Sequence, residues 1–474
     1  MRTLPVQTSL WEIYNGVSQS MEQQKPKLIK LLEAHIDFQQ LIPVEFRWTF
    51  YSRMGRNHIY RLESLVRALV LQKILGIPTD TLLLSFLRCS KELRDFCGFQ
   101  KVPDASQLTR FRENYCQYLQ LLFEQLVEQT EPICRKINKK LADYLIYDTS
   151  GIELPVKENN PKFFSSKLRQ AKQFVKQNPA YDPYKGVYAL LPKASATNSD
   201  AKIQYINGHF CYATKFGILT NGLGICRHIS FFDDSFRQQH PELEENSSSN
   251  PDADKELGDS TSLEPVLSDF FSTHPRFSYQ SFLGDSAFDS YKTYSLLKNT
   301  FQFQQACIPL NPRNSKEQDT CVNAFGIPVC PVVQRPFIYL GKSGGKNRSA
   351  RYKWVCPESK PNGTSRICSC EHPCTASSYG RCVYTYPDKD FRLCPGIPRD
   401  TEQWDKLYSR RVTVERTIHL FKDAFVLDTR KSHRTISAKA DLYLAGITQL
   451  IGVLLADALH QPKYIRRVRK LLAA

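Results

Sequence analysis

The sequence lacks the features of a secretion signal at its start. Residues 1–14 contain neither a cationic leader nor an apolar core of signal-peptide length. The most apolar run, residues 442–459, is near membrane-spanning length, but it is interrupted by Thr448, Gln449 and Asp457. We therefore expect a cytoplasmic protein in which this run forms a buried helix.

Acidic residues are scarce relative to basic ones. The chain has 64 Lys and Arg against 47 Asp and Glu, which gives a formal net charge of +17. Such an excess favours a polyanionic partner, because phosphate contacts release counterions from nucleic acid. Nucleic acid is the first candidate, and a merely basic soluble protein remains open on charge alone. A hydrophobic content of 41% excludes the polar composition of disordered chains.

The length of 474 residues predicts two or three domains. From about residue 9 to 135, apolar residues recur at steps of three and four and no clear strand signal interrupts them, which indicates a helical bundle. A DNA-binding helix-turn-helix and a plain helical cap both remain open for this part. Four segments are expected: a helical amino-terminal domain (1–135), the first part of a catalytic core (136–312), a Cys-rich insertion (313–400), and the last part of the core with a basic tail (401–474).

One helix of the amino-terminal domain has a clear start signal. Asp104 or Ser106 can cap a helix over residues 107–126, since short polar side chains accept hydrogen bonds from the first turn. We expect Arg110 and Arg112 on this helix to face phosphates.

Short apolar strands and helices alternate after residue 135. Strands are expected at 140–149, ending near Asp148, and at 281–284, ending on Asp285, with a hairpin within 203–232 around Asn221-Gly222. The order continues with a strand-poor basic stretch (156–202), a solvated acidic loop (241–259), a helix (287–297), a strand (302–309) and a late helix (401–424). This order predicts an α/β fold with a mixed sheet flanked by helices.

Carboxylates at the ends of two strands suggest a metal-dependent reaction. Phosphodiester cleavage uses a pair of divalent ions held by carboxylates about 3.5 to 4 Å apart, and hard oxygen ligands suit Mg2+ or Mn2+. Asp148 and Asp285 are candidates for such ligands. Each one alone is equally explained as a turn former or a helix cap.

A third acid lies on the late helix. At about 100° per residue, steps of three, four and seven place four side chains on one face, namely Tyr408, Arg411, Glu415 and Lys422. The acid would point toward metal and the cations toward phosphates. An exposed stripe with an Arg411–Glu415 ion pair is the alternative.

These four residues carry a family resemblance. The chain resembles the DDE transposases of bacterial insertion sequences, whose Tyr-Arg-Glu-Lys signature is reproduced by Tyr408, Arg411, Glu415 and Lys422. The settings of Asp148 and Asp285 also look like that family's first and second acids. The resemblance covers about residues 141–424, and residues 103–112 are similar to part of the family's amino-terminal domain.

The resemblance implies a ribonuclease H-like catalytic domain with the triad Asp148, Asp285 and Glu415 on two strands and a late helix. It implies that two Mg2+ (or Mn2+) ions activate water, which cuts the ends of the element, and that the 3′ hydroxyl then joins target DNA. The implied partners are transposon-end and target DNA, with self-association on DNA. Tyr408 would stack on a displaced base, and Arg411 and Lys422 would contact DNA.

Two alternatives to this reading remain. A transposase-derived DNA-binding protein that no longer cuts would retain the same fold, although intact acids favour the enzyme. A general ribonuclease H-like nuclease would explain the acids but not the cationic face. Near the second acid, Asp289 could assist chemistry, but a surface or helix-dipole role is favoured.

The insertion contains a cysteine group with the spacing of a loose metal site. Cysteine pairs at short spacing suit tetrahedral zinc, and disulfides are not expected in a reducing compartment. Zinc and ordinary reduced cysteines both remain open for Cys356, Cys368, Cys370 and Cys374. We expect a small lobe that touches DNA or a partner subunit, helped by cations at Lys342, Lys346, Arg348, Arg351 and Lys353.

Overall fold

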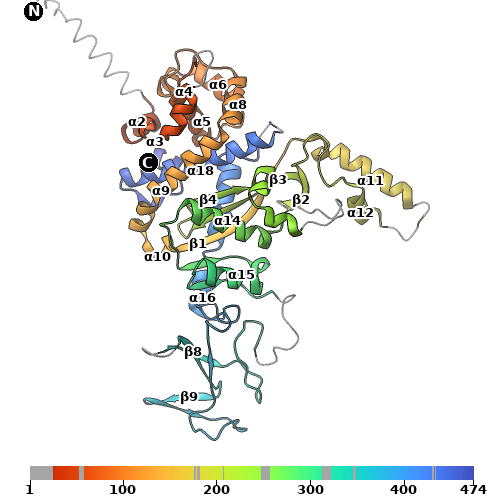
Figure 1. The fold of residues 1–474 in the computed structure, drawn as a ribbon, viewed down its shortest axis with the longest axis vertical. Coiled ribbons are helices and arrows are strands. Elements are labelled where there is room, and N and C mark those ends of the chain that lie inside the picture. Colours follow the sequence, from red (N-terminus) through yellow and green to blue (C-terminus); the bar gives the residue numbers. More distant parts are fainter. Residues whose placement is uncertain are drawn as a thin grey trace, which may run out of the picture. The chain divides into compact units, whose positions relative to one another are not determined.

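The computed structural model forms two compact units, shown in Figure 1. One unit comprises residues 1–133 and 420–474, and the other comprises residues 134–419. The boundary differs from the predicted grouping of 401–474 with the core, because the residues after 420 pack with the amino-terminal helices. The structure describes residues 25–52, 58–175, 178, 182–206, 208–246, 257–311, 322–344, 349–429, 432 and 434–473.

The first unit is helical in its described part, as predicted. At its centre α18 (Thr435–Ala458) packs on α2, α5, α8 and α19. This helix is long and apolar enough to span a membrane, but 89% of its most apolar window is buried inside the protein, which confirms the expected buried helix. The other helices are α2 (Lys27–His35), α3 (Phe38–Leu41), α4 (Val44–Ser52), α5 (Leu62–Leu75), α6 (Asp80–Cys89), α7 (Lys91–Cys97), α8 (Ala105–Asn114), α9 (Cys116–Ile137), η8 (Leu420–Ala424), η9 (Pro462–Tyr464) and α19 (Val468–Ala473).

The predicted helix over residues 107–126 is two helices. The cap is confirmed at Asp104, whose carboxylate accepts a hydrogen bond from the Gln107 amide at 3.0 Å. The chain breaks at Tyr115 between α8 and α9. The Tyr115 ring is buried at this break and packs against Phe46 and Phe50, with ring centroids 5.7 and 5.2 Å apart.

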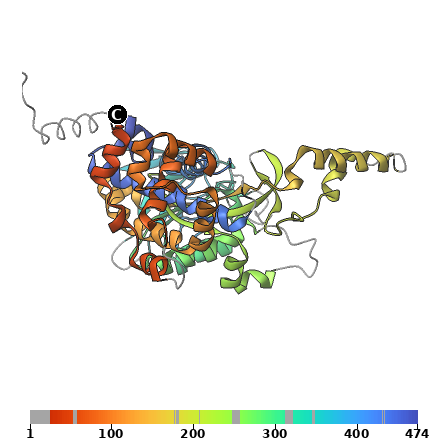
Figure 2. The same ribbon diagram turned by 90° about the horizontal axis from the view of Figure 1, so that it is seen from above.

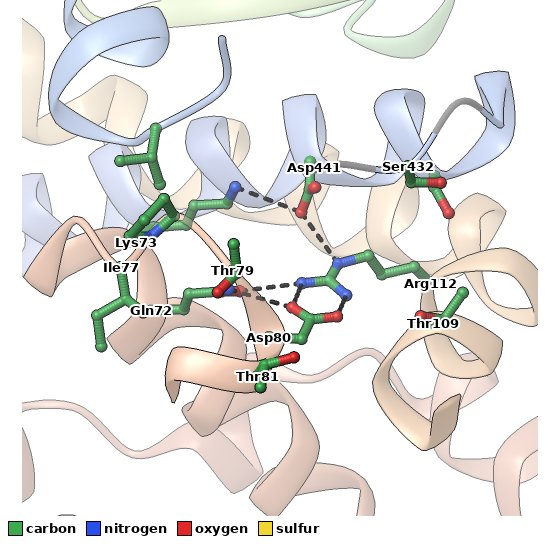
Figure 3. Close-up of a pocket in the computed structure, with 13 residues that line it drawn as sticks. Gln72, Lys73, Ile77, Thr79, Asp80, Thr81, Thr109, Arg112, Ser432 and Asp441 are labelled. Atoms are coloured by element: carbon green, nitrogen blue, oxygen red, sulfur yellow. Dashed lines mark hydrogen bonds and ion pairs between the residues drawn. The ribbon is translucent and has the colours of Figure 1, made fainter. Parts of the chain in front are cut away.

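The expectation that Arg112 faces phosphates is wrong. Arg112 is buried at the centre of a polar network (Figure 3). Its guanidinium contacts Asp80 at 2.7 Å, Asp441 at 3.0 Å and Gln72 at 2.9 Å. Lys73 reaches Asp441 at 3.3 Å. Burial raises the pKa of Asp80, but Arg112 outweighs burial and holds it below its ordinary value. The network joins α5, α6, α8 and α18.

The second unit is built on a six-stranded mixed sheet. Its strand order is β2-β3-β1-β5-β6, and β4 pairs with the other end of β3. β1 is antiparallel to β3 and parallel to β5, and β5 is parallel to β6. The strands are β1 (Tyr144–Glu153), β2 (Lys202–Ile206), β3 (His209–Asn221), β4 (Cys226–Phe231), β5 (Ser281–Leu283) and β6 (Gln305–Cys307).

Several predicted elements of this unit change in length. The hairpin is confirmed as β3–β4, but β1 continues to Glu153, so Asp148 lies within a strand rather than at its end. The expected loop at 241–259 begins as a short helix and ends where α14 starts, and residues 247–256 lie outside the described part. The helices here are α10 (Lys139–Ala142), α13 (Asp234–Gln239), η3 (Pro241–Asn246), α14 (Asp259–Thr273), η5 (Ser286–Phe288), α15 (Tyr291–Ser295), η6 (Leu296–Thr300), α16 (Glu402–Tyr408) and α17 (Val412–His419).

A helical arm separates β1 from β2. It contains η1 (Lys157–Asn159), α11 (Pro161–Val175), α12 (Pro183–Gly186) and η2 (Val187–Leu190). Figures 1 and 2 show α11 and α12 beside each other, beyond the β2 edge of the sheet. The expectation of a strand-poor stretch holds for its described residues.

The predicted insertion contains two small sheets. Their strands are β7 (Ile338–Ser343), β8 (Arg351–Val355), β9 (Ser359–Asn362), β10 (Ser365–Cys368) and β11 (Cys382–Thr385), paired in the orders β11-β8-β7 and β10-β9. Aromatic and cysteine side chains, including Tyr352, Trp354 and Cys356, form a hydrophobic cluster of its own. This segment therefore has a core separate from that of the large sheet.

Candidate active site

Strand register brings the first two acids together. The last residue pair of the parallel β1–β5 ladder is Ile146 with Leu283. Asp148 and Asp285 each lie two residues beyond that pair, so they are at the same level, Asp148 still within β1 and Asp285 just after the end of β5. Asp285 is further oriented by the Ala287 amide, which donates to its carboxylate at 2.9 Å. The sheet thus presents two carboxylates side by side.

The third acid comes from α17, which packs on β1 and β3. Glu415 lies in the first turn of α17, and Arg411 directly precedes that helix. The Arg411 guanidinium hydrogen bonds to Glu415, and its Nη2 atom lies 3.6 Å from Asp148 Oδ2 and 3.7 Å from Asp285 Oδ2. One guanidinium therefore contacts all three predicted catalytic acids.

Burial and like charge shape the electrostatics of this cluster. Burial raises the pKa of Asp148 to about 6, against the attraction of Arg411 and a 2.9 Å hydrogen bond from the Thr149 amide. Asp285 and Asp259 push that pKa in the same direction as burial. For Arg411, burial disfavours the charge, but the acids prevail and raise its pKa. Its Nε atom is buried and has no hydrogen-bond partner among the described residues.

Sequence reasoning missed two charged residues beside the triad. Asp259, the first residue of α14, accepts a hydrogen bond from the Thr149 hydroxyl and pairs with Lys215 at 2.8 Å. It had been assigned to the end of a solvated loop. The apolar spacing of residues 263, 266, 267 and 270 indicates a helix after it, and Asp is a common residue in a first turn.

The signature residues do not share one continuous helix, so the prediction of a single face is wrong. α16 ends at Tyr408, the chain turns through residues 409–411, and α17 begins at Val412. The Tyr408 ring stacks on Trp404 with centroids 6.3 Å apart. Burial raises the pKa of Tyr408, with Arg411 and Asp285 among the charged groups that act on it.

Lys422 lies in the π-helical turn η8 of the other unit, and its side chain is only 6% exposed. Its predicted contact with a phosphate would require this side chain to become exposed. The structure leaves that role as a prediction.

Asp289 is neither a surface residue nor a helix-dipole residue, contrary to the favoured expectation. It is fully buried, and Arg392 binds both of its oxygens at 2.9 and 2.7 Å. The Asn311 amide donates to it at 2.7 Å. Since Arg392 follows the small sheets in sequence, Asp289 anchors the insertion to the core.

The four candidate zinc ligands do not converge. Cys356 and Cys368 have their sulfur atoms 3.8 Å apart, but these residues form no group of three with Cys370 or Cys374 within 4.8 Å. Cys356 belongs to the hydrophobic cluster, with Cys368 and Cys374 packed against it. Among the expected cations, Lys342, Arg351 and Lys353 are described, while Lys346 and Arg348 lie outside the described residues.

The arm is basic and aromatic. It carries exposed cations at Lys157, Lys162, Arg169, Lys172, Lys185 and Lys193. Its described acids include Glu158, which is buried and accepts hydrogen bonds from Ser195 at 2.7 Å and Ala196 at 3.1 Å. Tyr184 and Phe174 are 61% and 48% exposed. Cations and exposed rings together suit a nucleic-acid backbone and unstacked bases.

A family model matches part of the helical unit, which comprises residues 1–133 and 420–474. Residues 18–114 match the family model described as a transposase domain (DUF772). The match indicates a transposase. Transposases act on DNA, in agreement with the net charge. The matched segment contains Arg112 but none of the three acids, and a search of curated proteins found no significant match.

Proposed function

We propose that the protein is a DDE transposase that binds the ends of an insertion sequence, cleaves them, and joins the 3′ hydroxyl to target DNA. The observation that carries this proposal is the convergence of Asp148, Asp285 and Glu415 on the Arg411 guanidinium. They come from a strand, a strand end and a late helix, which is the arrangement that a ribonuclease H-like catalytic domain implies.

The donor set of this site fits divalent metal. Three carboxylates are hard ligands of the kind that Mg2+ and Mn2+ prefer. Two such ions held by carboxylates would serve the attacking and the leaving oxygen of a phosphodiester. Burial and the charges of Asp285 and Asp259 raise the pKa of Asp148 despite Arg411, so further positive charge at the acids would lower the cost of ionising this carboxyl. Bound ions would supply activation of water and stabilisation of charge on the reacting phosphate.

The residues of the chain hold and orient these carboxylates. Arg411 offsets the repulsion among the acids, and backbone amides of Thr149 and Ala287 fix Asp148 and Asp285. With a pKa of about 6, Asp148 is ionised at neutral pH and available as a ligand. The basic arm would bind the phosphate backbone of DNA. Self-association on DNA accompanies the proposed reaction, since two element ends must be joined.

The test is cleavage of DNA that carries the element ends. Replacing Asp148, Asp285 or Glu415 by the matching amide should abolish cleavage with Mg2+ and Mn2+ and leave DNA binding intact, because an amide keeps shape but loses the charge that holds metal. Glu402→Gln is the matched control for Glu415→Gln, since Glu402 is also an exposed helical acid paired with a cation four residues away. Full activity of Glu415→Gln would refute the triad. Binding without cleavage by the unaltered protein would favour a silent DNA-binding protein.

A further inference from the structure

Three further side chains with metal-binding chemistry meet where the arm leaves the sheet. Glu153 is the last residue of β1, and His209 and Cys211 lie at the start of β3. In the antiparallel ladder Glu153 is opposite Ala213, and residues 209, 211 and 213 point to one face because strand side chains alternate. The register therefore places all three side chains on the same face of the sheet.

Their ligand atoms are close together. The Glu153 carboxylate, the His209 ring nitrogen and the Cys211 sulfur all lie within 4.8 Å of one another, and no other such group of three occurs in the described part of the chain. His209 Nε2 is 3.3 Å from Glu153 Oε2. Cys211 is buried at 3% exposure, whereas the His209 and Glu153 side chains are 53% and 41% exposed. One ligand thus comes from the interior and two face solvent.

A thiolate, an imidazole and a carboxylate form a donor set for zinc rather than magnesium. Tetrahedral bonds of about 2.0 to 2.3 Å place ligand atoms roughly 3.3 to 3.8 Å apart. The His209–Glu153 separation already has this size. An exposed ion pair would account for the contact between His209 and Glu153. It would not account for the Cys211 sulfur lying within 4.8 Å of both ligand atoms.

We propose that Glu153, His209 and Cys211 bind Zn2+, with a fourth position open to water. The site is distinct from the acid triad: Asp148 and Glu153 lie on opposite faces of β1, roughly 17 Å apart along the strand. This inference does not depend on the proposed transposase activity.

The position of the site suggests what the zinc does. The arm begins directly after Glu153, and its Tyr188 ring packs on Phe210, between the two β3 ligands, with centroids 4.7 Å apart. The Asn159 side chain donates to the backbone carbonyl of Tyr212 at 2.8 Å. Zinc would link β1 to β3 at the point where the arm begins. It would thereby fix the direction in which the basic arm leaves the sheet.

Titration of full-length protein with zinc alone tests the proposal. The starting protein should carry Cys368→Ser and Cys374→Ser, and also Asp148→Asn and Glu415→Gln, so that neither the insertion nor the acid triad contributes zinc. We expect one equivalent to bind, with a rise in the unfolding temperature, because a ligand of the folded state stabilises it. Cobalt in place of zinc should show thiolate-to-metal charge-transfer absorption that disappears in Cys211→Ser.

Variants at the exposed ligands guard against misfolding as an explanation. His209→Ala and Glu153→Gln should each weaken zinc binding at least about ten-fold, since loss of even an outer-shell partner costs about 10- to 100-fold. Their unfolding temperatures without zinc should match the starting protein. His35→Ala, which removes an exposed histidine elsewhere, should leave zinc binding unchanged. The proposal would be overturned if the starting protein bound no zinc. It would also be overturned if His209→Ala and Glu153→Gln bound zinc as tightly as the starting protein does.

Discussion

Replacement of Asp148 by asparagine should make the protein more stable at neutral pH while it removes activity. Asp148 lies within β1 with its side chain 18% exposed, and asparagine has the same shape without the charge. The ionised carboxylate is costly here because burial outweighs the attraction of Arg411. The variant therefore separates what the acid contributes to folding from what it contributes to chemistry.

The size of the effect follows from the pKa of Asp148. In the unfolded chain the carboxyl loses its proton near pH 3.8, whereas in the folded protein it keeps the proton until about pH 6. The folded state thus binds more protons between these values, and wild-type stability falls as pH rises through them. Each pKa unit corresponds to about 1.4 kcal/mol, so ionised Asp148 costs up to about 3 kcal/mol at pH 7.

Urea unfolding in the presence of a chelator measures this effect. Asp148→Asn should exceed wild type by about 1 to 3 kcal/mol at pH 7, and the difference should shrink to about 0.5 kcal/mol near pH 4, where the carboxyl of the folded protein is protonated. Asp289→Asn is the control, because it removes charge from a buried pair with Arg392 and should destabilise the protein at pH 7. If Asp148→Asn were no more stable than wild type at pH 7, the reasoning about burial would fail.

Two further predictions concern residues outside the triad. Arg112→Met should lower the free energy of unfolding by about 3 to 5 kcal/mol in urea, because it takes a partner from the buried Asp441 and the partly buried Asp80. A loss under about 1 kcal/mol would contradict the network. Arg169→Ala combined with Lys172→Ala should weaken DNA binding and reduce its salt dependence by about two phosphate contacts. Lys292→Ala is the control, because it removes an exposed cation of α15, and it should leave the salt dependence of DNA binding unchanged. If the double variant also left this salt dependence unchanged, the arm would not be part of the DNA interface.

Much of the candidate site could be predicted because its signals are local. An apolar run followed by an acid marks both Asp148 and Asp285, and parallel neighbouring strands then place them at one level. The Arg411–Glu415 ion pair, which the four-residue spacing offered as an alternative to a metal and phosphate role, is present in the structure. The sequence also predicted the buried nature of α18 from its composition.

Features that depend on contacts between distant segments could not be predicted. Arg112 looks like a surface cation on a polar helix, and only its acidic partner on α18, 329 positions later, makes it a buried residue. Asp289 needs Arg392 in the same way. The break after Tyr408 was missed because periodicity continues across it, although the backbone leaves the helix.

The Arg411 guanidinium lies among Asp148, Asp285 and Glu415, so the counter-ion of these acids is part of the protein itself. Because Arg411 is tethered beside the carboxylates, its local concentration exceeds that of any monovalent cation in solution. A potassium or sodium ion carries the same single charge as Arg411 but is not attached to the protein. Replacing the guanidinium by such an ion would therefore not stabilise the acids further. The three acids can therefore come together during folding without a bound metal ion.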